Sequence, residues 1–350
     1  MGVAPTSVSV IIPTYDRAPL VPRAVASALA CLRPGDEVIV VDDGSSDATE
    51  AALAPFGDHV RYLRLAHGGA GWARNRGVQE AHGALVAFLD SDDQWAPDKI
   101  ELQRALMERR PDVLFCSTDF AVHHDGSDDE HHYLARWHGD GRRWDAILGP
   151  GHRYSSIAPL PAGRADFDVH IGDLYPEVLH GHFVATFTLM VRRAGAGDAL
   201  WFAEDVPTYE DLECHARLAR TGLEAHLDCE TAVQWGHAGV RLTDADAYEC
   251  ASARLTVIER VYGHDRDFLT HHGGRYAGEL RRQHLIRARW LLARGRAPEA
   301  RRELRAAGGG PLAYRLAALA PGWLLSLLRR GVRAGQAGRR AVARARHRDG

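Results

Sequence analysis

The stretch Leu85-Val86-Ala87-Phe88-Leu89-Asp90-Ser91-Asp92-Asp93 decides the fold of this chain. Its apolar residues predict a strand that is buried on both faces, as in a parallel sheet. Ligands of such sheets bind just beyond the carboxyl ends of the strands, where the carboxylates lie here. Neighbouring carboxylates repel one another unless a cation neutralises them, and oxygen ligands suit Mg²⁺ or Mn²⁺. A solvated acidic turn that caps the helix expected after Ala96 is the alternative interpretation.

Strand and helix patterns alternate through the first third of the chain. Apolar, β-branched segments predict strands at 8–12, 37–41, 60–63, 85–89 and 113–116. Helical patterns lie between them, near 19–32, 46–54, 72–82 and 98–109. This alternation predicts an α/β fold with a mainly parallel sheet flanked by helices, and a Rossmann-like nucleotide-binding half in residues 1–120.

The pattern changes twice after residue 120. Residues 123–173, which include a His-rich run at 123–132, have the composition of solvated insertion loops. Beyond them we expect a strand at 183–191, a helix at 210–221, strands within 225–235, and helices from 244 onward. We therefore expect an α/β domain at 1–243, with its second half at 121–243, and a helical C-terminal extension at 244–350.

The composition excludes several classes of protein. With 45% hydrophobic and 25% charged residues, the 350-residue chain is long enough for a substantial core. The net charge of −3 gives no argument for binding nucleic acid. Five cysteines without a C-x-x-C pair indicate neither a disulfide framework nor a zinc site. The pattern predicts no signal peptide and no spanning helix, and hence a cytoplasmic location.

The C-terminal segment is strongly basic. Residues 326–350 contain eight arginines and a single acid, Asp349, and an apolar stretch at 316–328 precedes most of them. This combination is compatible with peripheral contact with an anionic membrane, on its inner face. A helical bundle with a basic end is the alternative.

Polar residues also follow the first two predicted strands. Pro13-Thr14-Tyr15-Asp16-Arg17 ends the first strand, and Asp42-Asp43 ends the second. Parallel strands bring these ends to the edge where Asp90 lies, so we expect one crevice there, with Tyr15 stacking on a base. The glycine-rich loop at 68–77 carries Arg74 where a dinucleotide fingerprint needs its third glycine, and it precedes a strand. Arg74 is therefore a candidate for binding the base or the diphosphate.

Five motifs now stand in order along the chain. They are VSVIIPTYDR (8–17), VIVVDDGSSD (38–47), GWARNRG (71–77), LVAFLDSDDQWAPDKIELQ (85–103) and PTYEDLECHARLARTG (207–222). The ordered set resembles the family 2 glycosyltransferases, nonprocessive enzymes of the GT-A fold, over residues 7 to about 240. The resemblance implies a nucleotide-sugar donor, of the UDP or dTDP type, and a role in cell-envelope or glycan biosynthesis.

The resemblance also implies a set of donor-binding residues. Positions that hold the nucleobase correspond to Pro13, Tyr15, Asp43 and Arg74, and those of the D-x-D motif, which binds ribose and metal, correspond to Asp90 and Asp92. The residues that flank these positions complete the expected donor site: Thr14, Arg17, Asp42 and Ser91. The implied cofactor is Mn²⁺ or Mg²⁺, held by Asp92, Asp93 and His237.

On the acceptor side, Asp211 matches the carboxylate that acts as general base on a hydroxyl group, and Glu210 is the alternative. Direct displacement by a hydroxyl activated in this way inverts the anomeric configuration. A helix N-terminal pair favoured by the macrodipole is the structural alternative. Similar enzymes direct the region of His180-Gly181-His182 toward the acceptor, which here is a glycan, a lipid-linked glycan, a protein or a small molecule.

Two other functions remain open from the sequence. A sugar-phosphate nucleotidyltransferase has a related fold, but its glycine-rich activation signature is replaced here by Pro13-Thr14-Tyr15. A degenerate member that binds a nucleotide or a membrane partner without catalysis is the second. The intact carboxylates argue against the degenerate member: Asp90, Asp92, Asp93, Glu210 and Asp211.

Overall fold

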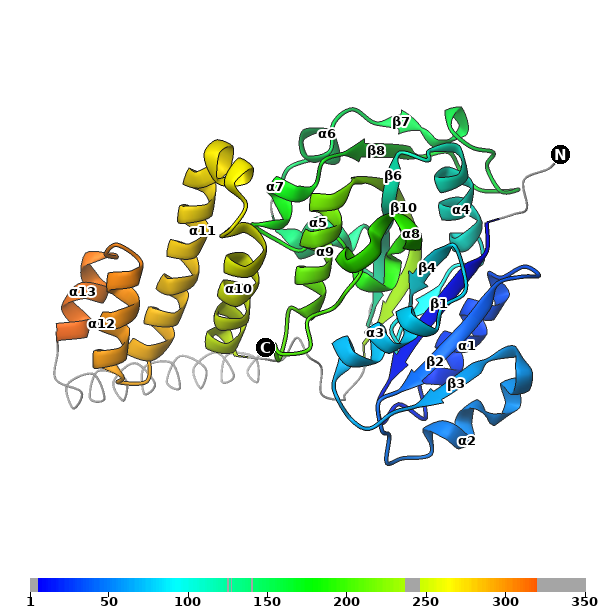
Figure 1. The fold of residues 1–350 in the computed structure, drawn as a ribbon, viewed down its shortest axis with the longest axis horizontal. Helices are drawn as coiled ribbons and strands as arrows, with labels where there is room; N and C mark the ends of the chain where they lie inside the picture. The colour runs from blue at the N-terminus through cyan, green and yellow to red at the C-terminus, as the bar shows by residue number, and fades with distance from the viewer. Residues whose placement is uncertain (1–5, 125, 127, 140, 237–245, 320–350) are drawn as a thin grey trace, which may run out of the picture. The chain divides into compact units, whose positions relative to one another are not determined.

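The computed structural model describes residues 6–124, 126, 128–139, 141–236 and 246–319. The chain divides into two units, Met1–Arg241 and Leu242–Gly350, and each is described by itself. The first unit is built on a ten-stranded sheet with helices packed on it, and the second is helical (Figure 1). The predicted α/β architecture followed by a helical region is confirmed.

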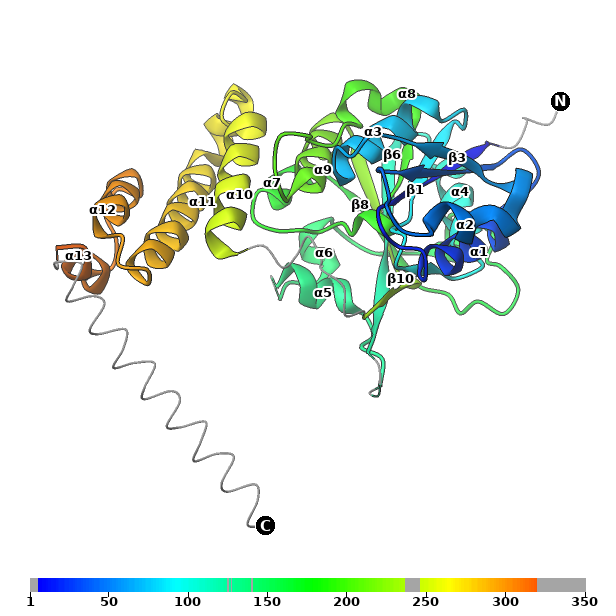
Figure 2. The same cartoon turned by 90° about the horizontal axis from the view of Figure 1, so that it is seen from below.

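The first part of the sheet is parallel, as predicted. Its strand order is β3-β2-β1-β4, with β1 at Val8–Thr14, β2 at Glu37–Asp42, β3 at Arg61–Arg64 and β4 at Leu85–Phe88. Every residue of β1 and β4 is buried, which explains their continuous apolar sequences. Helix α3 (Ala70–Glu80) lies on one face of these strands, and α1 (Val21–Ala30) and α2 (Thr49–Leu53) lie on the other (Figure 2).

Helix α3 packs very closely on β1 because of a glycine. A Cβ atom at Gly77 would lie 2.4 Å from Cγ2 of Ile11, closer than real Cβ atoms approach other atoms. The glycine thus fixes the distance between the helix and the strand. Since α3 also carries Arg74 and Asn75, this contact positions both side chains.

The second part of the sheet is mixed. Strand β9 (Met190–Arg192) runs antiparallel between β4 and β6 (Val113–His123), and β10 (Leu223–Trp235) lies parallel to β6. The antiparallel partners of β10 are β5 (Gln94–Trp95) and β8 (Asp168–Gly172), and β7 (His152–Arg153) pairs with β8. Parallel pairing therefore extends beyond the first four strands to β6 and β10, and the antiparallel strand β9 separates the two parallel parts.

Two sequence-based assignments were wrong in detail. The strand expected at 183–191 is reduced to β9, and a 3-10 turn at Thr186–Thr188 precedes it. Its apolar residues are buried by side-chain packing rather than by strand pairing, a distinction that apolar runs do not show. The expected loop at 123–173 contains α5 (Tyr133–His138), α6 (Trp144–Ile147) and the strands β7 and β8.

The only lysine of the chain is buried at the start of α4 (Lys99–Arg109). Its Nζ donates to the backbone oxygen of Thr188 at 3.1 Å and to Oε1 of Gln103, and it lies 4.3 Å from the centre of the Trp95 ring. Burial lowers the pKa of Lys99 to about 7. These contacts tie the segment after the acidic stretch to the turn that precedes β9.

The helical unit consists of α10 (Ala247–Tyr262), α11 (Arg266–Leu292), α12 (Ala297–Ala306) and α13 (Leu312–Leu319). Asp246 begins α10 with a capping box, and Arg254 pairs with the buried Glu279 on α11 at 3.0 Å. None of the helices within the described ranges combines the length and the hydropathy that crossing a membrane requires. The helical pattern expected beyond residue 319 and the basic segment at 326–350 lie outside the described residues.

Candidate functional site

The carboxyl ends of β1, β2 and β4 meet at one edge of the sheet (Figure 1). Thr14 is in register with Asp42, and the N–H of Asp43 donates to the oxygen of Thr14 at 2.9 Å. The N–H of Leu89 donates to the oxygen of Ile11 at 3.0 Å. The polar residues that follow these strands therefore border one region, as their sequence positions predict.

Asp43 organises the loop at the end of β2. Its carboxylate accepts hydrogen bonds from the N–H groups of Gly68 and Gly69 at 2.7 and 2.8 Å, and Nδ1 of His67 lies 2.8 Å from it. The ring of His67 stacks on Tyr15 with 4.4 Å between centroids, and Tyr15 is 43% exposed. Asp43 thus holds the glycine-rich loop in place, while Tyr15 presents an aromatic ring at the edge.

Three other predicted residues lie within the fold at this edge. Asp42 is fully buried and accepts hydrogen bonds from the N–H of Ser45 at 2.7 Å and from the phenol of Tyr62. Pro13 pairs with Val41 in the sheet, and Thr14 Oγ1 is buried without a hydrogen-bond partner. The hydrogen bonds of Asp42 therefore stabilise the ends of the strands from inside the fold, and its side chain is not exposed to a ligand.

Arg74 joins two distant parts of the chain. The side chain is buried, and its two terminal nitrogens donate to Oδ1 of Asp90 and to Oε1 of Glu210, each at 2.8 Å. The guanidinium lies 5.3 Å from the centre of the Phe202 ring. Burial lowers the pKa of Arg74, but the two carboxylates outweigh it and raise the pKa well above the usual value. The end of β4 and the start of α9 (Glu210–Thr221) are therefore held together.

The carboxylates around Arg74 outnumber the single guanidinium. Burial raises the pKa of Asp90 and of Glu210 above their usual values, although Arg74 opposes this effect in both. The charges of Asp92 and Asp211 add to the rise at Asp90, and that of Asp211 adds to it at Glu210. Asp90 and Glu210 therefore lie in a region of excess negative charge, and Arg74 stabilises the charged form of both.

Asn75, the next residue, fixes the segment that faces α9. Its amide nitrogen donates to the oxygen of Phe202 at 2.8 Å and to Glu204 at 2.7 Å, and its oxygen accepts from the N–H of Phe202 at 2.8 Å. A Cβ atom at Gly71 would lie 2.4 Å from the oxygen of Ala203. The sequence analysis did not single out Asn75, although its place in the GWARNRG motif was a signal for it.

The remaining acidic residues of the D-S-D-D stretch face different surroundings. The Asp92 side chain is 24% exposed, and its carboxylate lies 4.0 Å from Nε of Arg17. Its backbone oxygen accepts from Arg23 at 2.8 Å. Asp93 is buried and accepts a hydrogen bond from the N–H of Trp235 at 3.2 Å. Ser91 is buried as well.

These surroundings decide how a divalent cation fits. Asp92 fits as a carboxylate ligand, since proteins bind Mg²⁺ through one or two carboxylates together with substrate phosphates. Asp93 is buried and one of its carboxylate oxygens accepts from β10, so its role as a second ligand stays a prediction. His237 lies outside the described residues. In the described ranges, a three-residue group with ligand atoms within 4.8 Å of one another is found elsewhere, at Asp119, His132 and Asp228.

Asp211 lies in the first turn of α9, beside polar groups of the turn before β9. Thr186 Oγ1 donates to Oδ2 of Asp211 at 3.2 Å and lies 3.4 Å from Nε2 of His215. Burial raises the pKa of Asp211, but His182, His215 and Arg74 outweigh it and lower the pKa below the usual value. Burial lowers the pKa of His215 to about 4, so this ring is neutral at pH 7 and its charge acts on Asp211 only in the acidic range. The sequence did not single out either residue: Thr186 approaches Asp211 only through folding, whereas the i, i+4 spacing of Asp211 and His215 on α9 was a signal for His215.

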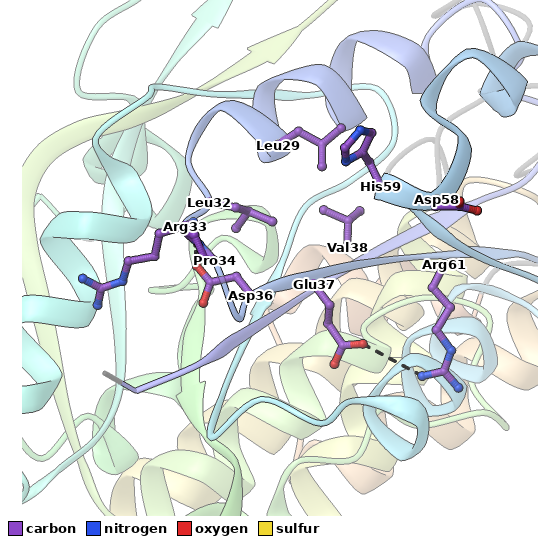
Figure 3. Close-up of a pocket in the computed structure, with 10 residues that line it drawn as sticks. All are labelled: Leu29, Leu32, Arg33, Pro34, Asp36, Glu37, Val38, Asp58, His59 and Arg61. Atoms are coloured by element: carbon purple, nitrogen blue, oxygen red, sulfur yellow. Dashed lines mark hydrogen bonds and ion pairs between the residues drawn. The ribbon is translucent and has the colours of Figure 1, made fainter. Parts of the chain in front are cut away.

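A pocket at the other end of β2 is not connected with these residues (Figure 3). It begins where β2 begins, at Glu37, whereas Asp42 and Asp43 follow the opposite end of the strand. An ion pair of 3.9 Å joins Glu37 to Arg61 across it. Its other lining residues are Leu29, Leu32, Arg33, Pro34, Asp36, Val38, Asp58 and His59.

Comparisons with known proteins agree with this geometry. Residues 9–153 match the family described as Glycosyl transferase family 2. An uncharacterized glycosyltransferase of Rickettsia prowazekii is 28% identical over 194 residues, which cover 55% of this chain and 53% of that protein. The succinoglycan biosynthesis protein ExoO of Rhizobium meliloti is 42% identical over 104 residues, 29% of each chain. The chain thus spans about half the length, or less, of these relatives.

A solved structure shows the same fold. The structure of S. aureus TarS in complex with UDP-GlcNAc superimposes with a TM-score of 0.55 and 15% sequence identity, covering 85% of this chain and 88% of that chain. Residues 9–153 of the chain therefore form a glycosyl transferase family 2 domain.

Proposed function

We propose that the chain transfers a sugar from a nucleotide-diphosphate donor to an acceptor hydroxyl group, with inversion at the anomeric carbon. One observation carries the proposal: Arg74 bonds Asp90 and Glu210 at once, so the donor-side carboxylates and Asp211 border a single site. A transferase needs this arrangement, since the leaving group and the acceptor proton must be handled on opposite sides of one reacting carbon.

The donor is proposed to lie along the edge formed by β1, β2 and β4. The exposed ring of Tyr15 is available for stacking on a base, and Asp90 and Asp92 lie at the end of β4. We propose a UDP- or dTDP-type sugar; the fold neighbour TarS was solved with UDP-GlcNAc. Mn²⁺ or Mg²⁺, when bound at Asp92, would neutralise charge that develops on the departing diphosphate.

Asp211 is proposed as the general base. Its pKa is lowered, so the carboxylate is ionised and ready to accept a proton at neutral pH. Glu210 is a poorer candidate because its carboxylate is buried and paired with Arg74. The acceptor is proposed to be a glycan hydroxyl, as expected for a chain similar to a succinoglycan biosynthesis protein.

A thermal-shift screen of nucleotide sugars with and without Mn²⁺ tests the donor site. A ligand at about 100 times its Kd stabilises the native state by about 2.7 kcal/mol. We expect UDP- or dTDP-sugars to raise Tm more with Mn²⁺, and Asp92→Ala to remove the Mn²⁺-dependent part. Asp112→Ala is the matched control, because this exposed residue pairs with Arg110 at the start of β6. An Mn²⁺-dependent shift that survives Asp92→Ala contradicts the ligand assignment.

We also propose peripheral contact with an anionic membrane through the C-terminal region. Helix α13 exposes Leu312, Leu316 and Leu319 by 66%, 58% and 72%, and their spacing places them on one side of the helix. The sequence continues into residues 326–350 with their eight arginines. Apolar side chains next to basic ones are typical of helices that lie on anionic lipid surfaces.

Co-sedimentation with vesicles tests this contact in the full chain. We expect binding to phosphatidylglycerol vesicles, little binding to phosphatidylcholine vesicles, and an affinity weakened by about tenfold or more when Leu316 and Leu319 are changed to serine. Equal sedimentation of the variant and the wild type would show that the leucines do not contact lipid. Equal binding to both kinds of vesicle would exclude an electrostatic contribution to membrane binding.

A further inference from the structure

Two stacked pairs of a tyrosine and a histidine flank the proposed site. On the donor side, Tyr15 stacks on His67 with 4.4 Å between ring centroids. On the other side, Tyr209 stacks on His182 with 4.9 Å between centroids and 27° between the ring planes. Tyr209 is two residues before Asp211, and the charge of His182 acts on Asp211. The second pair therefore lies beside the proposed base.

The backbone of Tyr209 has an unusual conformation. Its φ of +66° makes it one of three non-glycine residues with positive φ in the described part of the chain. A bulky side chain in this region strains the backbone. Its side chain makes no capping hydrogen bond to α9, so helix capping does not account for the conformation. This conformation places the Tyr209 ring on His182, directly before the helix that carries Asp211.

We propose that Tyr209 and His182 form the acceptor subsite and that it binds an uncharged pyranose ring. This inference rests on the proposed function, because it takes Asp211 as the base. The C–H face of a sugar packs on the aromatic ring of tyrosine, and its hydroxyl groups form hydrogen bonds with the ring nitrogens of histidine. Both residues are half-buried, as expected for the wall of a binding site.

The charges near the pair exclude an anionic acceptor ring. Glu210 and Asp211 adjoin Tyr209, and Asp90 lies on the other side of Arg74. Arg74 is buried in its two ion pairs, so its guanidinium is not available to a phosphate or a uronate. The three carboxylates outnumber the cations Arg74 and His182, so a further carboxylate brought to this site would add to an excess of negative charge.

The transfer step balances with the acceptor in this position. An acceptor hydroxyl gives its proton to Asp211, and the oxygen forms a bond to the anomeric carbon with its lone pair. The bond from that carbon to the diphosphate oxygen breaks, and its electron pair leaves with the nucleoside diphosphate. The ring of Tyr209 takes no part in bond making; it orients the acceptor.

Saturation-transfer NMR on the full chain tests the subsite directly. The probes are the methyl glycosides of glucose, galactose, mannose and N-acetylglucosamine, with methyl glucuronide as the charged comparison. We expect transfer from the protein to C–H protons of at least one neutral glycoside and none to the glucuronide. Tyr209→Phe keeps the ring and should bind as the wild type does, whereas Tyr209→Asn should weaken binding by about tenfold. Asparagine tolerates positive φ, so this variant removes the ring without straining the backbone.

A matched variant and a second ligand distinguish a failure of the proposed subsite from a failure of the proposed function. Tyr15→Asn removes the ring of the other pair and should leave glycoside binding unchanged while weakening the binding of UDP or dTDP. Equal glycoside binding by Tyr209→Asn and the wild type, or binding of no neutral glycoside, overturns the subsite. Equal binding of the glucuronide overturns the exclusion of anionic rings. If the wild type binds none of UDP, dTDP and GDP, the proposed function fails, and the glycoside comparison still decides the subsite.

Discussion

Asp211→Asn should reduce sugar transfer by about 10²- to 10⁴-fold, the usual contribution of a positioned general base. The amide keeps the shape of the carboxylate and its place beside Thr186, but it cannot accept the proton of an acceptor hydroxyl. The proposed donor contacts lie at the ends of β1, β2 and β4, so the Kd of UDP should remain the same. Single-turnover transfer from the donor sugar identified by thermal shift, with nucleotide affinity measured in parallel, gives both quantities.

Glu210→Gln is the comparison for this variant, since it changes the neighbouring carboxylate. We expect it to keep measurable transfer, because Glu210 is bonded to Arg74 rather than available to an acceptor. The opposite pattern, with Asp211→Asn active and Glu210→Gln inactive, would reassign the base to Glu210.

The pH dependence of transfer should reflect the same environment. A base acts when it is deprotonated, so activity is lost as the pH falls through its pKa. The pKa of Asp211 lies below its usual value, because the charges of His182, His215 and Arg74 outweigh burial. The acid limb of kcat attributable to Asp211 should therefore lie below about pH 4, the usual pKa of an aspartate.

Arg74→Ala should lower the free energy of unfolding by about 3–5 kcal/mol, the cost of removing one partner from a buried ion pair. Two carboxylates, Asp90 and Glu210, would be left without their cation. Burial already raises both pKa values, and the loss of Arg74 raises them further. A raised carboxylate pKa favours the folded state at low pH, so the deficit of the variant should grow as the pH rises through these values.

Arg76→Ala provides the control on the same helix. Its side chain is 43% exposed and pairs with Glu80 at 2.9 Å, so its loss should cost less than about 1 kcal/mol. Urea denaturation of both variants and the wild type at several pH values measures the difference. A similar small effect for Arg74→Ala would mean that the two carboxylates are solvated or protonated without it.

The sequence predicted which residues lie at the carboxyl ends of the strands better than it predicted the contacts between distant segments of the chain. The run from Leu85 to Asp93 indicated a buried strand with acids at its end, since apolar length and strand order determine both features. Arg74 was singled out, but for the base or diphosphate, whereas its observed partners are Asp90 and Glu210. Glu210 is 136 positions away, and no local pattern records a contact over such a distance.

Other residues show the same limit. Asp43 was expected to bind a base, which stays a prediction, and the sequence did not show that its carboxylate also accepts from the N–H groups of Gly68 and Gly69. Thr186 lay inside an apolar run that favoured a strand, but the chain turns there and brings its hydroxyl to Asp211. Such contacts depend on how the antiparallel strand β9 enters the sheet, which the apolar pattern alone does not determine.

The buried lysine gives the core of the protein a single side chain with which an amine-directed reagent can react. Amine-directed reagents need an accessible and deprotonated amine, and the only lysine side chain, Lys99, is fully covered in the folded state. With its pKa lowered to about 7, it is already largely deprotonated at mildly alkaline pH, so access rather than charge limits its reaction. The rate at which such a reagent reaches Lys99 therefore reports how often the segment between α4 and β9 opens.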